Sequence, residues 1–239
     1  MKDRYREWIA KKPGWFRNPD GPVGIHIATD PDEIATIREE MRRRLASRGI
    51  SARRADAWTR IGIVYEDPYL CLVRDAVRFE PGHVPGTYIR QMPTGDGPGG
   101  VVVLPLVGDD ILLVRIFRHA LRDFSLEFPR GFCERPPRGM DPDAAIEWNA
   151  RRELAEETGA EAETIEHLGT CHTDTSFSGS GVAFCAARIL SFGEPQVSEG
   201  IDQVFRISRP EMERRIAENG IVDGLTLMAY AKAKSRGIL

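Results

Sequence analysis

Cysteine is scarce in this sequence, and the spacing of the few that occur excludes two common kinds of site. The four cysteines of the 239-residue chain are Cys71, Cys133, Cys171 and Cys185, with no CxxC pair or other metal-ligand spacing. A chain of this length can bury a sizeable core without disulfides. We therefore expect reduced, mostly buried thiols, and neither a thiolate metal centre nor a disulfide framework.

Long apolar runs are also missing. The stretch 1–16, MKDRYREWIAKKPGWF, is charged throughout and lacks the apolar centre of about 7 to 15 residues that marks a secretory signal. No segment approaches the ~20 consecutive apolar residues that a membrane-spanning helix needs. We expect a cytoplasmic protein without a membrane partner.

The chain has no excess of basic charge either. It carries 33 lysines and arginines against 36 aspartates and glutamates, which gives a net charge of -3. This balance produces no general field that would attract a polyanion, so nucleic acid is not an expected partner. Arginines do cluster between residues 42 and 48, but Glu39 and Glu40 lie beside them, which favours a solvated helix face.

The features that are present change at about residue 60. Residues 1–28 show neither helical nor strand periodicity, whereas Asp30 can cap a helix that begins at Pro31 and ends near Gly49. The apolar face of this helix comprises Ile34, Ile37, Met41 and Leu45. We interpret residues 1–60 as an N-terminal extension with one amphipathic helix.

Residues 61–239 predict one layered domain. Residues 61–95 hold short runs rich in Val, Ile, Leu and Tyr, split by turn residues, which indicates antiparallel strands. GVVVLPLV and ILLVRIFR, separated by GDD, predict a hairpin of two apolar strands. A long helix, further strands and a helical C-terminus follow, and this order is typical of a mixed α/β or α+β fold.

The long helix is predicted over residues 141–159, DPDAAIEWNARRELAEETG. Asp141 is suited to cap its N-terminus, and Gly159 is suited to end it. A buried stripe along its flank is expected from Ile146, Ala150 and Leu154.

Three carboxylates on that helix form a candidate metal site. Glu153, Glu156 and Glu157 stand at i, i+3 and i+4, so they are neighbours on one face, roughly 5 to 6 Å apart at Cβ. Their like charges repel unless a cation lies over them, and oxygen ligands suit Mg²⁺ or Mn²⁺. The alternative is a solvated acidic face with Arg151 and Arg152 as ion-pair partners.

The residues around these glutamates resemble a known family. RELAEETGA, residues 152–160, resembles the second half of the Nudix box, R-E-U-x-E-E-x-G-U with U a bulky apolar residue, and departs from it at the small Ala160. LEFPRGFCE, residues 126–134, is similar to the strand and glycine turn that precede this box. ILLVRIFR resembles the strand that carries a substrate arginine, and IVDGLTLMAYAKAKSRG resembles the C-terminal helix region of the ADP-ribose pyrophosphatase branch. The resemblance extends from Ile61 to the C-terminus and implies a Nudix α/β/α sandwich with a mixed sheet.

The resemblance also implies an activity and an assembly. The activity is Mg²⁺-dependent hydrolysis, with Mn²⁺ as a possible substitute, of the diphosphate bond in a nucleoside diphosphate linked to a second group. ADP-ribose, cleaved to AMP and ribose 5-phosphate, is the leading small-molecule substrate. The alternatives are a nucleotide sugar of the GDP-mannose type, a dinucleotide, or a non-catalytic domain that senses a nucleotide. Members of this branch commonly exchange the strands before the catalytic core between subunits, so a homodimer with residues 61–95 exchanged is expected.

The roles in the metal site follow from the resemblance. Glu153 and Glu157 would be the principal metal ligands, and Glu156 would support them. The backbone carbonyl of Arg130 would add an oxygen from the turn. Arg152 would orient the carboxylates by ion pairing.

Substrate binding and proton transfer are assigned to other segments by the same resemblance. Arg118 would bind the diphosphate through two hydrogen bonds from its planar guanidinium, unless it is only an exposed arginine at a strand end. Glu199, in the loop EPQVSEGID, would be the general base, unless it is only a solvated carboxylate. Other candidates for the base are Glu156, Glu194, Asp202 and the loop 172–181.

One position departs from the box. Counting back from Arg152, the first glutamate of the box falls at Ala144, and the loop GFCERPPRGMD is several residues longer than the family pattern. Glu134, Asp141 or Asp143 could supply the missing carboxylate, so the partner of Arg152 stays open.

Overall fold

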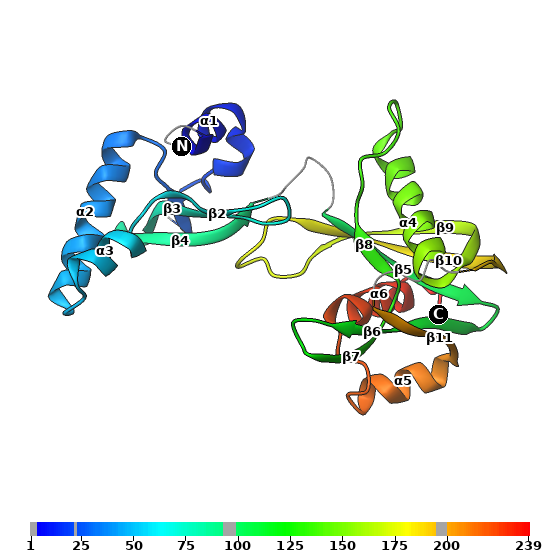
Figure 1. The fold of residues 1–239 in the computed structure, drawn as a ribbon. Coiled ribbons are helices and arrows are strands. Elements are labelled where there is room, and N and C mark those ends of the chain that lie inside the picture. Colours follow the sequence, from blue (N-terminus) through cyan, green and yellow to red (C-terminus); the bar gives the residue numbers. More distant parts are fainter. Residues whose placement is uncertain (1–3, 22, 93–98, 195–199) are drawn as a thin grey trace. The chain divides into compact units, whose positions relative to one another are not determined.

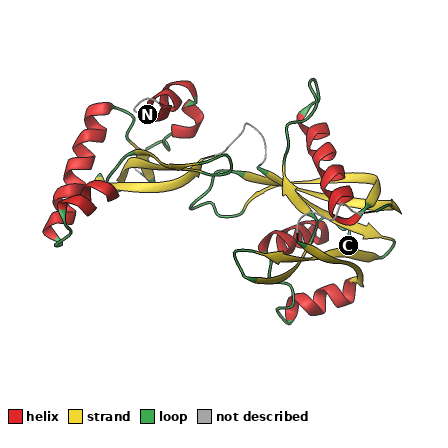
Figure 2. Cartoon of the chain, in the orientation of Figure 1, coloured by secondary structure: helices red, strands yellow, loops and turns green. Residues whose placement is uncertain are grey.

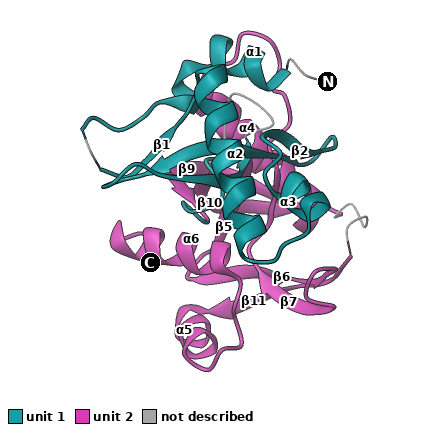
Figure 3. Ribbon diagram, turned by 90° about the vertical axis from the view of Figure 1, so that its left-hand side faces the viewer, with its two compact units in different colours: residues 1–94, 174–179 teal, residues 95–173, 180–239 magenta. Residues whose placement is uncertain are grey.

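The computed structural model describes residues 4–21, 23–92, 99–194 and 200–239, which form two units (Figures 1 and 3). Unit 1 comprises residues 1–94 and the short segment 174–179, and unit 2 comprises residues 95–173 and 180–239. Each unit has its own sheet and its own buried apolar cluster. In the described ranges, no helix combines the length and the apolar character needed to cross a membrane.

Unit 1 contains a four-stranded antiparallel sheet. Its strands are β1 (Ile25–Ile27), β2 (Gly62–Glu66), β3 (Cys71–Phe79) and β4 (Val84–Met92), and β3 pairs with each of the others. The helices of unit 1 are α1 (Arg4–Lys11), the 3-10 helix η1 (Pro13–Phe16), α2 (Pro31–Ser47) and α3 (Ala52–Trp58).

The helix predicted after Asp30 is present as α2. The Asp30 side chain accepts hydrogen bonds from the backbone N–H groups of Asp32 and Glu33, both at 3.0 Å, which is the expected cap. Residues 1–60 also contain α1 and α3, so the prediction of one helix there was wrong. Both helices are too short to give a clear periodic pattern. The boundary predicted at residue 60 does not coincide with the division between the units, because β2, β3 and β4 form one sheet with β1.

A buried carboxylate ties α1 to the sheet of unit 1. Asp75 on β3 is 1% exposed, and it accepts hydrogen bonds from the Tyr5 hydroxyl and from the Arg90 Nε, both at 2.6 Å. Burial, followed by the charge of Asp75, raises the pKa of Tyr5 above its ordinary value. The three residues come from α1, β3 and β4, so a contact distant in sequence fixes the N-terminal helix in place.

Unit 2 is built on a mixed sheet with the strand order β11-β6-β5-β10-β9. Its strands are β5 (Gly100–Val107), β6 (Asp110–Arg118), β7 (Asp123–Glu127), β8 (Arg130–Phe132), β9 (Ala160–His172), β10 (Gly181–Phe192) and β11 (Ile201–Ser208). β5 and β10 run parallel, whereas β7 pairs antiparallel with β6 and β8 antiparallel with β5. β5 and β6 form the hairpin predicted from GVVVLPLV and ILLVRIFR.

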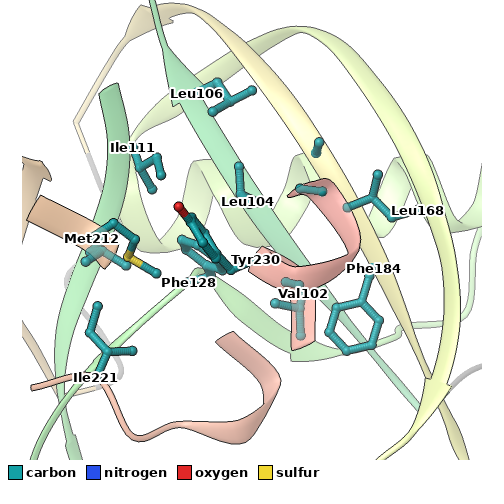
Figure 4. Packing of buried hydrophobic residues seen from close by; sticks show 14 of the residues in the cluster. Val102, Leu104, Leu106, Ile111, Phe128, Leu168, Phe184, Met212, Ile221 and Tyr230 are labelled. Atoms are coloured by element: carbon teal, nitrogen blue, oxygen red, sulfur yellow. The ribbon is translucent and has the colours of Figure 1, made fainter. Parts of the chain in front are cut away.

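Helices cover both faces of this sheet (Figures 1 and 2). α4 (Pro142–Thr158) packs on one face, and α5 (Arg209–Ala217) and α6 (Gly224–Ser235) pack on the other. Side chains of β5 alternate between the two faces: Val101 packs with α4, whereas Val102 and Leu104 pack with Tyr230 of α6 (Figure 4). The predicted α/β/α sandwich with a mixed sheet is confirmed.

The segment 174–179 connects β9 to β10 and yet belongs to unit 1. The backbone N–H of Gln91 on β4 donates to the Phe177 carbonyl at 2.8 Å, and the Tyr88 hydroxyl donates to the Ser176 carbonyl at 2.5 Å. Gln91 and Ser178 also form an isolated parallel bridge. The connection therefore extends the edge of β4, which its sequence did not indicate.

The cysteines are free, as predicted. Cys71 and Cys185 are buried, and Cys133 and Cys171 are half-buried. Burial raises the pKa of Cys133 to about 11 and that of Cys185 to about 12, so both thiols are protonated and unreactive at neutral pH.

Candidate functional site

α4 presents the box glutamates because its ends and its buried side are fixed. The Asp141 side chain accepts a hydrogen bond from the backbone N–H of Ala144 at 2.9 Å, and Gly159 ends the helix with a φ of 68°. The predicted stripe of Ile146, Ala150 and Leu154 is buried against the sheet. Both ends of the helix and its buried stripe are therefore confirmed.

Two of the glutamates lie against the start of β8. Glu153 and Glu157 are each 5% exposed, and the Glu157 carboxylate accepts a hydrogen bond from the backbone N–H of Arg130 at 3.0 Å. A Cβ atom at position 131 would overlap the Glu153 carboxylate, so a larger residue there would force that carboxylate to move. The Glu153 carboxylate therefore lies directly against the backbone of Gly131.

Arg152 lies among three carboxylates. Its guanidinium is 2.5 Å from Glu153, 2.8 Å from Glu156 and 3.4 Å from Glu134, and it donates to the Phe132 carbonyl at 3.0 Å. Burial lowers the pKa of Arg152, but the neighbouring carboxylates outweigh that effect, and the net pKa is raised. Arg152 is therefore charged at every working pH, and it contacts the carboxylates that it is expected to orient.

The three box glutamates do not converge on a single point. Within the described ranges, no group of three or more His, Cys, Asp or Glu side chains is arranged to hold a metal ion. Glu156 turns toward Arg152, whereas Glu157 faces the backbone of Arg130. Helical spacing places the Cβ atoms and leaves the carboxylates free to turn to other partners, so the roles of the three glutamates as metal ligands stay a prediction.

Glu153 and Glu157 nevertheless have the donor chemistry that a hard cation requires. Both carboxylates are nine-tenths buried or more on successive turns of α4, next to the backbone of the β7–β8 turn. Carboxylate and carbonyl oxygens of this kind suit Mg²⁺. The residues present therefore fit a divalent cation held by Glu153, Glu157 and the turn, without Glu156 as it lies here.

A second charged cluster surrounds Arg118. Its guanidinium donates three hydrogen bonds to the Glu127 carboxylate, at 2.5 to 3.1 Å, and Arg130 lies 2.6 Å from the same carboxylate and 3.1 Å from Asp223. Glu127 is 1% exposed. Burial raises the pKa of Glu127, but the two arginines lower it further, so the net pKa is depressed.

The sequence did not single out Glu127 or Asp223. The only signal was an acidic residue inside the apolar strand LEF, since a carboxylate at such a position needs a buried partner. Asp223 also caps α6, because its carboxylate accepts a hydrogen bond from the Thr226 N–H at 2.8 Å. The Thr226 hydroxyl in turn accepts from the backbone N–H of Phe128 at 3.0 Å, which ties α6 to the β7–β8 turn.

The three candidates for the missing box carboxylate occupy different places. Glu134 lies beside Arg152, whereas Asp141 caps α4 and Asp143 is exposed, 4.0 Å from His167. The position counted as the first box glutamate, Ala144, is inside α4.

The candidates for the general base are not brought together in the described ranges. Glu199 lies outside them. Asp202 pairs with Arg115, Glu156 pairs with Arg152, and Glu194 is exposed. The identity of the base stays a prediction.

Comparison with known proteins agrees with this architecture. Residues 97–221 match the family described as NUDIX domain. The chain is 30% identical over 138 residues to the "Methanol dehydrogenase activator" of Bacillus methanolicus, a match that covers 55% of this chain and 70% of that protein. A solved structure titled "Crystal structure of ADP compounds hydrolase" has the same fold, with a TM-score of 0.59 and 18% identity over 75% of this chain and 95% of that one. The chain belongs to the Nudix family.

Proposed function

We propose that this Nudix protein is a Mg²⁺-dependent pyrophosphatase that cleaves the diphosphate bond of a nucleoside diphosphate linked to a second group. One observation carries the proposal: Glu153 and Glu157 are buried beside each other against the glycine turn, with Arg152 paired to Glu153. Two carboxylates buried on successive turns of one helix are costly unless cations compensate them, and Arg152 already lies beside one of them. A domain that only senses a nucleotide would tolerate the loss of these glutamates, and all of them are present in this chain.

Different residues would bind the metal and the substrate. Glu153, Glu157 and the Arg130 carbonyl would hold Mg²⁺, and Mn²⁺ could replace it. When bound, the ion would withdraw charge from the diphosphate and lower the pKa of a bound water. Arg152 keeps Glu153 in place by an ion pair at 2.5 Å.

Arg118 is suited to bind the diphosphate. The Glu127 carboxylate holds its guanidinium in one orientation, and 31% of the side chain is exposed, so a ligand can reach it. A fixed planar guanidinium can make two hydrogen bonds to phosphate oxygens without losing further side-chain entropy.

ADP-ribose is the substrate that we propose, with AMP and ribose 5-phosphate as products. Support comes from the resemblance of the C-terminal helix region to the ADP-ribose pyrophosphatase branch and from the likeness of the fold to a structure titled as an ADP compounds hydrolase. A GDP-mannose type of nucleotide sugar and a dinucleotide are the competing substrates.

A substrate screen tests the proposal. The purified protein is incubated with ADP-ribose, GDP-mannose or a dinucleotide, with Mg²⁺ or with EDTA, and phosphate is measured after treatment with a phosphatase. We expect the highest kcat/KM with ADP-ribose, and no product in EDTA. Binding of ADP-ribose in calorimetry without any turnover would refute the hydrolase and favour a sensor.

A further inference from the structure

The carboxylate that pairs with Arg152 comes from an unexpected place. Glu134 follows β8 by two residues, and one of its oxygens lies 3.4 Å from the Arg152 guanidinium. Ala144 cannot provide such a partner, because it is eight residues before Arg152 on the same helix, a rise of about 12 Å along the axis.

Asn149 holds Glu134 by its backbone. The Asn149 side chain on α4 is 2% exposed; its Oδ1 accepts from the Glu134 N–H at 2.8 Å, and its Nδ2 donates to the Glu134 carbonyl at 3.3 Å. The same Nδ2 donates to the Ala145 carbonyl at 2.9 Å, which fixes the side-chain amide on its own helix. One buried amide thus satisfies both backbone groups of a single loop residue, and it sets the direction in which the Glu134 side chain leaves the loop.

We propose that Asn149 is a positioning residue for Glu134, and that Glu134 orients Arg152 in place of the box carboxylate missing at Ala144. The inference rests on the proposed function, since Arg152 matters for catalysis only if Glu153 holds a metal. The hydrogen bonds from Asn149 fix the backbone of Glu134 at the start of the loop. The Glu134 carboxylate pairs with Arg152, and Arg152 pairs with Glu153 and Glu156.

The competing carboxylates have other contacts. Asp141 is occupied at the N-terminus of α4, where it accepts from the Ala144 N–H. Asp143 has an 87% exposed side chain and lies near His167 on β9, not near Arg152. Position 144 falls inside α4, whereas Glu134 lies near the beginning of the loop between β8 and α4.

Replacing Glu134 tests the first part of the proposal. Mn²⁺ affinity is measured by electron paramagnetic resonance without substrate, and kcat and KM are measured with ADP-ribose. Glu134→Gln should weaken Mn²⁺ binding or lower kcat by roughly 10- to 100-fold, the range for residues that orient metal ligands, with KM nearly unchanged. Glu134→Asp keeps the charge and should recover part of the loss. Asp143→Asn is the matched control and should behave as wild type.

Replacing Asn149 tests whether its hydrogen bonds to the Glu134 backbone matter for the site. Asn149→Ala should also reduce Mn²⁺ affinity or kcat. The double variant Asn149→Ala/Glu134→Gln should lose no more activity than the more impaired of the two single variants, because both changes act through one contact. Additive losses would mean that Asn149 only supports the fold, and would overturn its role. The thermal midpoint of each variant shows whether it is folded, and the Glu134 variants decide the matter if Asn149→Ala does not fold.

Adding a glutamate at position 144 tests whether a carboxylate there could orient Arg152 in place of Glu134. Ala144→Glu in the Glu134→Gln background should restore nothing, and restoration would overturn the proposal. Wild-type protein that neither binds Mn²⁺ nor hydrolyses any substrate would refute the proposed function itself. An active wild type with an unchanged Glu134→Gln variant would refute this inference alone.

Discussion

At the residue scale, what could be foreseen depended on how local each contact is. The grouping of Glu153 and Glu157 on one face follows from helical spacing, and their burial follows from the apolar stripe beside them. The direction of each carboxylate does not follow from spacing. Glu156 turns to Arg152, four residues earlier, instead of joining the other two.

Glu157→Gln should abolish turnover of ADP-ribose in Mg²⁺ while leaving the fold intact. The substitution keeps the size of the side chain and an oxygen for the Arg130 N–H, but it removes a charge from the proposed metal site. The steady-state rate and the circular dichroism spectrum check this, with Glu161→Gln on the exposed part of β9 as the control. An undiminished kcat in the Glu157 variant would remove the metal assignment.

Glu199→Gln addresses the general base. If Glu199 takes the proton from the attacking water, kcat should fall by roughly 10²- to 10⁴-fold, the range for one positioned proton acceptor, and KM should barely change. Metal affinity should survive, because Glu153 and Glu157 are untouched. Nearly full activity in this variant would move the search to Glu194, Asp202, Glu156 or the loop 172–181.

At the scale of elements, charged and polar side chains join pieces that are far apart in the sequence. Glu127 at the end of β7 receives Arg118 from β6 and Arg130 from β8, and Asp223 ties Arg130 to the start of α6. The capped ends of α4 were predictable, because caps involve neighbours within four residues. The ion pairs between elements were not predictable, since nothing in the LEFPRG motif tells which strand or helix will supply the partners of Glu127 and Arg130.

Glu127→Gln should remove the contribution of the Glu127 ion pairs to the pH dependence of the free energy of unfolding. The folded-state pKa of Glu127 is lowered below its ordinary value of 4.5, so its ionised form contributes stability above about pH 4.5, and that contribution is lost as the pH falls through the folded-state pKa. The variant should lose about 3 kcal/mol at pH 7, because two partly buried arginines are left undercompensated.

Urea denaturation of both proteins between pH 3 and pH 7 measures this difference. The wild type should become less stable toward pH 3 more steeply than the variant. Parallel curves for the two proteins would contradict a structural role of the ionised Glu127.

At the scale of the whole molecule, the grouping of the chain into two units was not evident from the sequence. The strands β2, β3 and β4 form one sheet with β1, and the connection 174–179 adds to the edge of β4. Parts of the chain that are about 85 residues apart, such as Gln91 and Phe177, meet in this way. Sequence patterns report the type of an element and say little about which sheet an edge will join.

We expect a homodimer with an isologous interface, in which residues 61–95 provide the exchanged strands. The expectation comes from the resemblance to the ADP-ribose pyrophosphatase branch. Light scattering at micromolar concentration should report twice the chain mass of 26.7 kDa. A mass of one chain would remove this proposal, and with it any active site shared between subunits.

The sequence by itself determined the family and the main elements of unit 2. The helix α4, its caps, the β5–β6 hairpin and the family all follow from residues within one or two turns, or one strand, of each other, because local hydrogen bonds and side-chain periodicity specify them. Only the tertiary structure decided that Glu134, held by Asn149, faces Arg152, and that Glu127 lies between Arg118 and Arg130. The reason is physical: the path of the loop after β8 and the packing of β6, β7, β8 and α6 set these distances, and neither is encoded by spacing along one helix or strand.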